Sequence, residues 1–115
     1  MNLCEKTVAH ISKIKHDVNI SLEECITKEI TKHMQNLTLS QIMKSKDLEY
    51  TNVNIYLTNK DYVNLLNLMS HKDKTSMFNT VCKNLGFYTQ SVHYSYDGEY
   101  SAWTISDNLY FESNE

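Results

Sequence analysis

Apolar residues recur at intervals of three and four along the first part of the chain, which is the spacing of one face of an α-helix. Residues 4–16 carry Cys4, Val8 and Ile11 at this spacing, with lysines between them. This pattern predicts an amphipathic helix, followed by a short connection at residues 16–20.

A second helix is predicted to begin at Ser21. Ser21 and Glu24 form the S-x-x-E pattern of a capping box, which marks a helix N-terminus. The apolar positions that follow at helical spacing are Leu22, Cys25, Ile26, Ile30, Met34 and Leu37. Residues 36–45 either continue this helix or begin a short third one.

The pattern changes to a period of two at residues 52–57. Val53, Ile55 and Leu57 alternate there with polar or amphipathic residues, which predicts a strand with one buried face.

Two more helices are predicted after this strand. The first begins near Thr58 and runs to Met69, and the polar residues 71–74 separate it from the second. The second covers residues 75–85 and ends at Gly86, where a helix terminus favours a residue that tolerates the left-handed conformation.

Asp97 and Gly98 give the strongest hairpin signal, because a type I′ turn needs two residues that tolerate positive φ. A two-residue turn would pair Tyr96 with Glu99. The apolar face of this hairpin would hold Tyr88, Val92, Tyr94, Tyr96, Trp103 and Ile105. The polar face would hold Thr89, Ser91, His93, Ser95, Tyr100, Ala102, Thr104 and Ser106.

These patterns together predict a single α+β domain over residues 1–115. It consists of N-terminal helices, one strand, two helices and a C-terminal antiparallel β-hairpin. Residues 107–115 form an acidic tail that either extends the last strand or frays. The order helix, strand, helix, helix, hairpin over residues 21–106 is also that of a winged-helix module.

Composition indicates where such a protein operates. The chain lacks arginine and proline and is rich in residues with A/T-rich codons, which indicates an AT-rich genome such as that of a virus, phage or mobile element. No signal peptide is expected, and no run approaches the ~18 apolar residues of a membrane helix. The three cysteines are far apart and match neither disulfide nor zinc spacing. We therefore expect a cytoplasmic protein, in the host cytoplasm if it is viral.

Charge is distributed unevenly. Residues 1–46 hold seven lysines and five acidic residues, whereas residues 47–115 hold four lysines and nine acidic residues. After Lys83 there is no lysine or arginine, and five acidic residues follow. Such a region steers towards basic partners and away from nucleic acid.

No catalytic, cofactor-binding or metal-binding residues are expected. Cys25, Glu29 and His33 share a helix face, but no CxxC or HExxH motif supplies further ligands. Cys82 lies within a helix pattern, where a buried and inert thiol is the usual outcome. Both glycines are explained by a turn and a helix end, so a glycine-rich phosphate loop is excluded.

The sequence therefore favours a non-enzymatic protein-binding module. In this hypothesis an acidic, tyrosine-rich hairpin blocks a basic, nucleic-acid-binding surface of a host protein, as an inhibitor or accessory protein that antagonises host defence would. The expected partner-binding residues are Tyr94, Tyr96, Asp97, Glu99, Tyr100 and Asp107. A homodimer through the edge strand at residues 52–57 is compatible with the same pattern.

The alternative is a winged-helix DNA-binding regulator. The helix at residues 75–85 would then be the recognition helix and the hairpin the wing. Its outward residues would be Ser76, Asn79, Thr80, Lys83 and Asn84. Asp97 and Glu99 on the wing, together with the absence of arginine, speak against phosphate binding.

Overall fold

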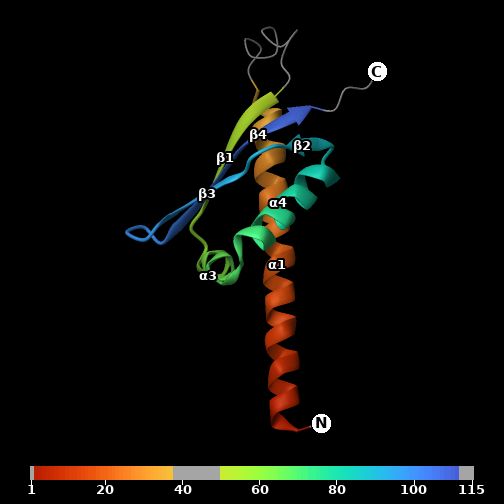
Figure 1. Ribbon diagram of the computed structural model, residues 1–115, viewed down its shortest axis with the longest axis vertical. Helices are drawn as coiled ribbons and strands as arrows, with labels where there is room; N and C mark the ends of the chain where they lie inside the picture. The colour runs from red at the N-terminus through yellow and green to blue at the C-terminus, as the bar shows by residue number, and fades with distance from the viewer. Residues whose placement is uncertain (1, 38–49, 112–115) are drawn as a thin grey trace.

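The computed structural model of the chain describes residues 2–37 and 50–111. Its elements follow the predicted α+β order, which is thereby confirmed (Figure 1). They are α1 (Leu3–Gln35), β1 (Tyr50–Leu57), α3 (Lys60–Leu68), α4 (His71–Asn84), β2 (Phe87–Thr89), β3 (His93–Asp97) and β4 (Ala102–Phe111). Residues 38–45, which bear on the expected third helix, and residues 112–115 lie outside the described ranges.

The connection predicted at residues 16–20 is wrong, because α1 is one continuous helix of 33 residues. No glycine or proline interrupts it, and extending an existing helix costs far less than nucleating a new one. The cap forms at Asn2, whose Oδ1 accepts a hydrogen bond from the Glu5 backbone N–H at 2.8 Å. The Ser21–Glu24 pattern therefore lies within a helix and does not begin one.

The next two helices begin at other positions than predicted: α3 is capped one residue after Thr58, and α4 starts at His71, four residues before the predicted start at residue 75. Asn59 caps α3, because its Oδ1 accepts from the Asp61 N–H at 2.9 Å. Ser70 caps α4, because its Oγ accepts from the Asp73 N–H at 3.1 Å. The polar break predicted at residues 71–74 is therefore wrong, and those residues form the first turn of α4. Gly86 ends α4 with φ of 87°, as predicted.

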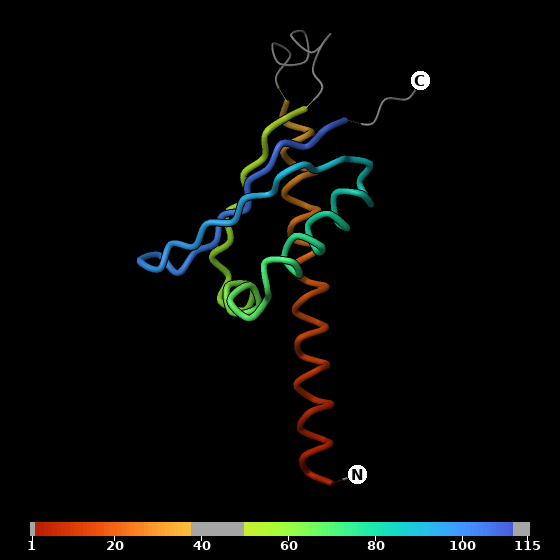
Figure 2. Tube along the Cα trace, viewed as in Figure 1, coloured from red at the N-terminus to blue at the C-terminus, as the bar shows by residue number. Residues whose placement is uncertain are grey.

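The sheet is built around β4. On one side β4 pairs antiparallel with β1 along the full length of β1, from Tyr50 opposite Tyr110 to Leu57 opposite Trp103. On its other side β4 pairs with β2 and then with β3. Figure 2 shows β3 and β4 continuing as a hairpin away from the helices. Residues 107–111 thus extend the last strand, with Leu109 fully buried.

A bulge separates β2 from β3. Thr89 lies opposite Leu109, but His93 lies opposite Ser106, so this edge has one residue more than β4 over the same stretch. The extra residue reverses which face each side chain occupies. As a result Tyr88 is exposed on the uncovered face of the sheet, and its predicted place on the core side is wrong.

The two-residue turn predicted at Asp97 and Gly98 is also wrong. Asp97 pairs with Ala102, so residues 98–101 form a four-residue loop. The residue with positive φ in this loop is Ser101, at 46°. The register differs from the predicted one by an even number of residues, so the side chains of residues 92–106 keep their predicted faces, whereas Thr89, like Tyr88, lies before the bulge and is on the opposite face to the one predicted. Val92, Trp103 and Ile105 accordingly lie on the core side.

The core lies between the helices and one face of the sheet, and the other face carries no helix in the described part (Figure 1). α1 contributes only residues from its second half. The fully or almost fully buried residues include Leu22, Ile26, Ile30, Val53, Ile55, Leu66, Phe78, Cys82, Ile105 and Leu109.

Ile26→Ala should lower the free energy of unfolding by roughly 2–5 kcal/mol, because a fully buried isoleucine leaves a cavity when it is truncated. Ile20→Ala is the matched control on the same helix, and its exposed side chain should cost less than about 1 kcal/mol. Urea unfolding followed by circular dichroism measures both. Equal losses would contradict the position of the core on α1.

Candidate functional site

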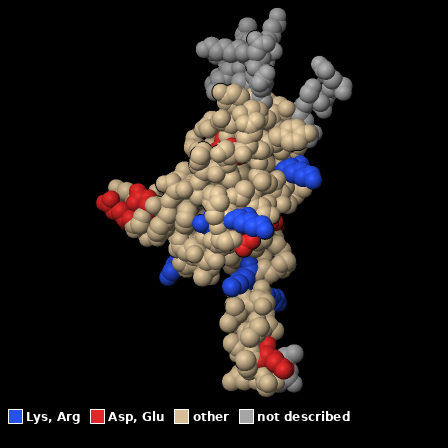
Figure 3. All heavy atoms as spheres, viewed as in Figure 1, with Lys and Arg blue, Asp and Glu red and all other residues tan. Residues whose placement is uncertain are grey.

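The hairpin tip, defined here as Tyr96, Asp97, Glu99 and Tyr100, projects beyond the helices (Figure 1). All four residues are exposed, with Tyr96 at 44% and Tyr100 at 65%. Figure 3 shows acidic side chains gathered at this projection, apart from the lysines on the body of the molecule. Within the tip the Asp97 carboxylate accepts a hydrogen bond from the Glu99 N–H at 3.0 Å, which orders the start of the loop.

Trp103, which lies opposite Tyr96 in the strand pairing, ties the hairpin to α3 and α4. Its Nε1 donates a hydrogen bond to Asn67 Oδ1 on α3 at 2.9 Å. The Nζ of Lys74, on α4, lies 4.3 Å from the centroid of the Trp103 ring, within cation–π range. On the same face the Tyr96 ring lies 5.0 Å from Trp103. The Trp103 contacts therefore hold the strands directly beside the tip in place.

Two of the six residues expected to bind a partner lie away from the tip. Tyr94 is half-buried against the edge of His71, with ring centroids 5.7 Å apart, and burial raises the pKa of its hydroxyl to about 12. Asp107 is only 3% exposed and faces the core from β4. The tip residues are the four expected residues that a partner could reach.

Asp107 is a buried carboxyl group beneath the bulge. Its Oδ1 accepts from the Asn108 N–H at 2.7 Å, while its Oδ2 has no hydrogen-bond partner among the described residues. Burial raises the pKa of this carboxyl, although hydrogen bonds from the backbone N–H groups of Asn108 and Ser91 act in the opposite direction.

Neither Cys25 nor Cys82 is an activated nucleophile. Burial raises the pKa of the Cys82 thiol to about 12, and the nearby charge of Asp107 acts in the same direction. Burial also raises the pKa of Cys25. A thiol is nucleophilic only as the thiolate, so both are poorly reactive near neutral pH. Among residues 2–37 and 50–111 no cluster of three or more His, Cys, Asp or Glu side chains could hold a metal ion.

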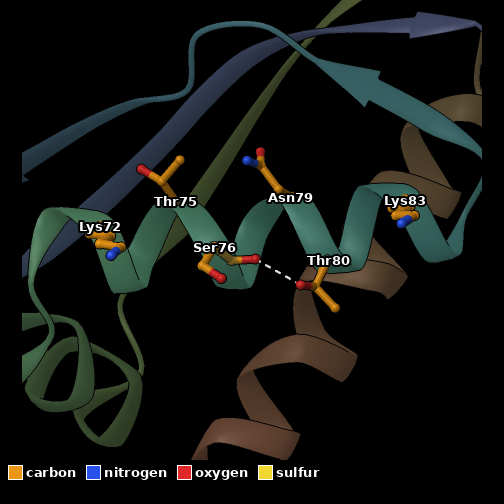
Figure 4. A pocket seen from close by; sticks show the side chains of 6 residues that line it. All are labelled: Lys72, Thr75, Ser76, Asn79, Thr80 and Lys83. Carbon is orange, nitrogen blue, oxygen red and sulfur yellow. Dashed lines mark hydrogen bonds between the residues drawn. The ribbon is translucent and has the colours of Figure 1, made fainter.

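The outer face of α4 forms a second candidate surface. All five residues predicted to point outward are exposed. A shallow hollow along this helix is lined by Lys72, Thr75, Ser76, Asn79, Thr80 and Lys83 (Figure 4). Two of these side chains already have partners, since Thr80 Oγ1 donates to the Ser76 carbonyl at 2.8 Å and Asn79 accepts from Thr89. Lys72 lies at one end of this hollow and Lys83 at the other.

The uncovered face of the sheet is a surface that the sequence analysis missed. Tyr50, Tyr110 and Tyr88 lie side by side across β1, β4 and β2, with the Tyr50 and Tyr110 ring centroids 5.4 Å apart. The signal was present in the alternation of β1, whose exposed positions are Tyr50, Asn52, Asn54 and Tyr56.

No protein-family model, curated protein or solved structure matches this chain. In the described part of the chain, no helix combines the length and the apolar character needed to cross a membrane. The candidate surfaces therefore have to be assessed from their own geometry.

Asp107→Asn should change the free energy of unfolding, relative to the wild type, more favourably at pH 7 than at pH 4. A carboxyl whose pKa is raised on folding stabilises the folded state when it is protonated, and this contribution is lost as the pH rises through the folded-state pKa. The asparagine side chain has no charge to bury at either pH.

The measurement is the difference in unfolding free energy between wild type and variant, from urea titrations at both pH values. Asp97→Asn, an exposed carboxyl on the same hairpin, is the control and should show a smaller change with pH. An Asp107→Asn difference that is identical at pH 4 and pH 7 would contradict the burial argument.

Proposed function

We propose that the protein is a non-enzymatic protein-binding module whose hairpin tip contacts a basic surface on a partner protein. The observation that carries this proposal is the exposure of two tyrosines and two acidic residues together on a projecting hairpin. None of the four is needed to fill the core.

The chemistry of the tip suits this role. Tyrosine supplies a large, rigid contact area with a polar end and is enriched at protein interfaces. Asp97 and Glu99 add a negative field that steers association towards a basic surface. Because Trp103 ties the strands beside the tip to α3, binding would order fewer groups, which lowers its entropic cost.

A basic surface on a protein is the usual footprint of nucleic-acid binding, because lysine and arginine neutralise phosphates. The tip would block such a surface sterically, and its carboxylates would pair with the basic side chains there. The absence of arginine and the abundance of residues that A/T-rich codons encode support an origin in a phage or mobile element, for which the partner would be a host protein, including a defence nuclease.

Glu99→Lys/Tyr100→Ala should weaken binding to the partner by about 30- to 1,000-fold, because tyrosines and charges at interface centres often contribute about 1–2 kcal/mol each. The partner is first captured from a host lysate by the wild-type protein and identified by mass spectrometry. Its Kd is then measured for each variant by biolayer interferometry.

The matched control is Glu24→Lys/Tyr56→Ala. It makes the same charge change on the exposed side of α1 and removes a tyrosine that is 61% exposed, away from the tip. Its Kd should match that of the wild type. Equal affinity for all three proteins would show that the tip is not the binding surface.

DNA binding through α4 is a second candidate, because Lys72 and Lys83 frame the polar outer face of the helix that follows α3. The element order of a winged-helix module supports it. The acidic tip at the position of the wing opposes it, since it would repel phosphates.

Fluorescence anisotropy with duplex DNA pools at low salt separates the two candidates. We expect no sequence-dependent binding up to ~10 μM protein, a concentration at which even non-specific DNA-binding proteins often bind. Sequence-dependent binding that Lys72→Ala/Lys83→Ala abolishes, and that Asp97→Asn/Glu99→Gln strengthens, would instead support the winged-helix regulator.

A further inference from the structure

The first half of α1 extends beyond the rest of the molecule. This segment, residues 3–17, is called the arm below; every residue in it is exposed (Figure 1). No other element in the described part of the chain packs on it. The buried residues of α1 begin only at Leu22.

The arm nevertheless carries an apolar stripe. At 100° per residue, Cys4, Val8, Ile11 and Val18 lie on the same side of α1 as the buried Leu22. The face that packs on the core in the second half of the helix thus continues into the arm. Val8 is 57% and Ile11 48% exposed, so this continuation has no cover within the described monomer.

A helix of this length is marginally stable in water when nothing packs on it, because most helical stability in proteins comes from tertiary contacts. The arm is nevertheless built as a helix, with an Asn2 cap and no glycine or proline. We therefore expect another protein segment to pack on the apolar stripe of the arm when the protein functions.

We propose that the arm pairs in antiparallel orientation with the arm of a second copy of this chain. A pairing centred between Ala9 and His10 places Val8 of each copy opposite Ile11 of the other. The paired region then covers almost the whole arm, with Leu3 opposite His16, and it ends before the buried part of α1 in each copy.

Charge selects this orientation. Lys15 is the one charged residue in the middle of the stripe, between Ile11 and Val18. In the antiparallel pair Lys15 lies beside Cys4 and Glu5 of the second copy, so two Glu5–Lys15 pairs form by symmetry. A parallel pair in register would instead place Lys15 against Lys15 and Glu5 against Glu5, which is destabilising.

The pairing would form an elongated dimer with one folded body at each end and a hairpin tip on each body. Few apolar layers contribute, so the interface is small and we expect a dissociation constant on the order of 1–100 μM. This inference does not depend on what the tip binds.

Sedimentation equilibrium of the full chain should show a concentration-dependent dimer. Val8→Asp/Ile11→Asp should abolish it, while Ala9→Asp/His10→Asp, which places the same charges on the opposite side of the arm, should leave dimers in place. Circular dichroism checks that both variants stay folded. A wild-type protein that is monomeric at ~1 mM, well above the expected Kd, would overturn the proposal.

A dimer that survives Val8→Asp/Ile11→Asp would also overturn it and would point to the exposed edge of β1. If the wild-type protein stays monomeric and its arm binds only a helix of another protein, the dimer proposal is likewise overturned.

Orientation is tested by charge exchange. Lys15→Glu alone should weaken the dimer about 3- to 30-fold, because the pair occurs twice and each exposed pair contributes modestly. The exchanged variant Glu5→Lys/Lys15→Glu should recover most of that loss. No recovery would contradict the antiparallel pairing.

Native Cys4 provides an independent measure of orientation, since its thiol is exposed. In the antiparallel dimer the two Cys4 positions are separated by roughly 16 Å along the helix axis, too far for a disulfide. Mild oxidation should therefore leave Cys4 unlinked, whereas Val8→Cys/Ile11→Cys in a Cys4→Ser background should cross-link. A rapid Cys4–Cys4 disulfide in the wild-type dimer would establish a parallel arrangement and overturn the proposal.

Discussion

The pairing of β4 on both of its edges is the constraint on which the rest of the structure depends. β4 holds β1 on one side and β2 with β3 on the other, so segments from the middle and the end of the chain join one sheet. Its core-facing side chains include Ile105 and Leu109, both fully buried against the helices. Register in such a strand is strongly specified, because a slip of one residue would turn these side chains towards water.

That constraint explains the unusual features around β4. The bulge between β2 and β3 lies across from Asp107, and a backbone N–H of the bulge, that of Ser91, reaches the buried carboxyl. The same bulge turns Tyr88 outwards, beside Tyr110 on the uncovered face. The extra residue of the bulge thus lies beside the buried Asp107 carboxyl and also places Tyr88 on the solvent-facing side of the sheet.

Much of the fold could be predicted from the sequence, because the apolar spacing of α3, α4, β1 and β4 reports directly on burial. The wrong predictions came from local sequence signals for a helix start and a turn, which tertiary structure outweighed. A capping pattern at Ser21 did not begin a helix, since continuing α1 is cheaper than restarting it. Asp97-Gly98 did not form a two-residue turn, and the register of β3 and β4 instead places Tyr96 opposite Trp103, where the two rings pack together.

The candidate site was predictable only in part, for a related reason. Charge and aromatic content identified the hairpin, but they could not separate its exposed residues from its buried ones. Tyr94 follows the same alternation as Tyr96, yet it lies two residues nearer the helices and is covered by His71. Asp107 is acidic like Asp97, but its position on β4 faces the core. Exposure depends on how far each strand extends past the helix layer, which periodicity does not report.

The division between buried and exposed hairpin residues also separates stability from binding. Trp103, Tyr94 and Asp107 are tied to α3, α4 or the core, so changes to them alter the stability of the fold and cannot isolate the proposed binding role. Glu99 and Tyr100 lie in the loop beyond the last strand pair, and their side chains carry little of the core. Folding alone does not require a tyrosine and an acid there, which is why the tip, more than any other part of the hairpin, is the place where the function of this chain should be sought.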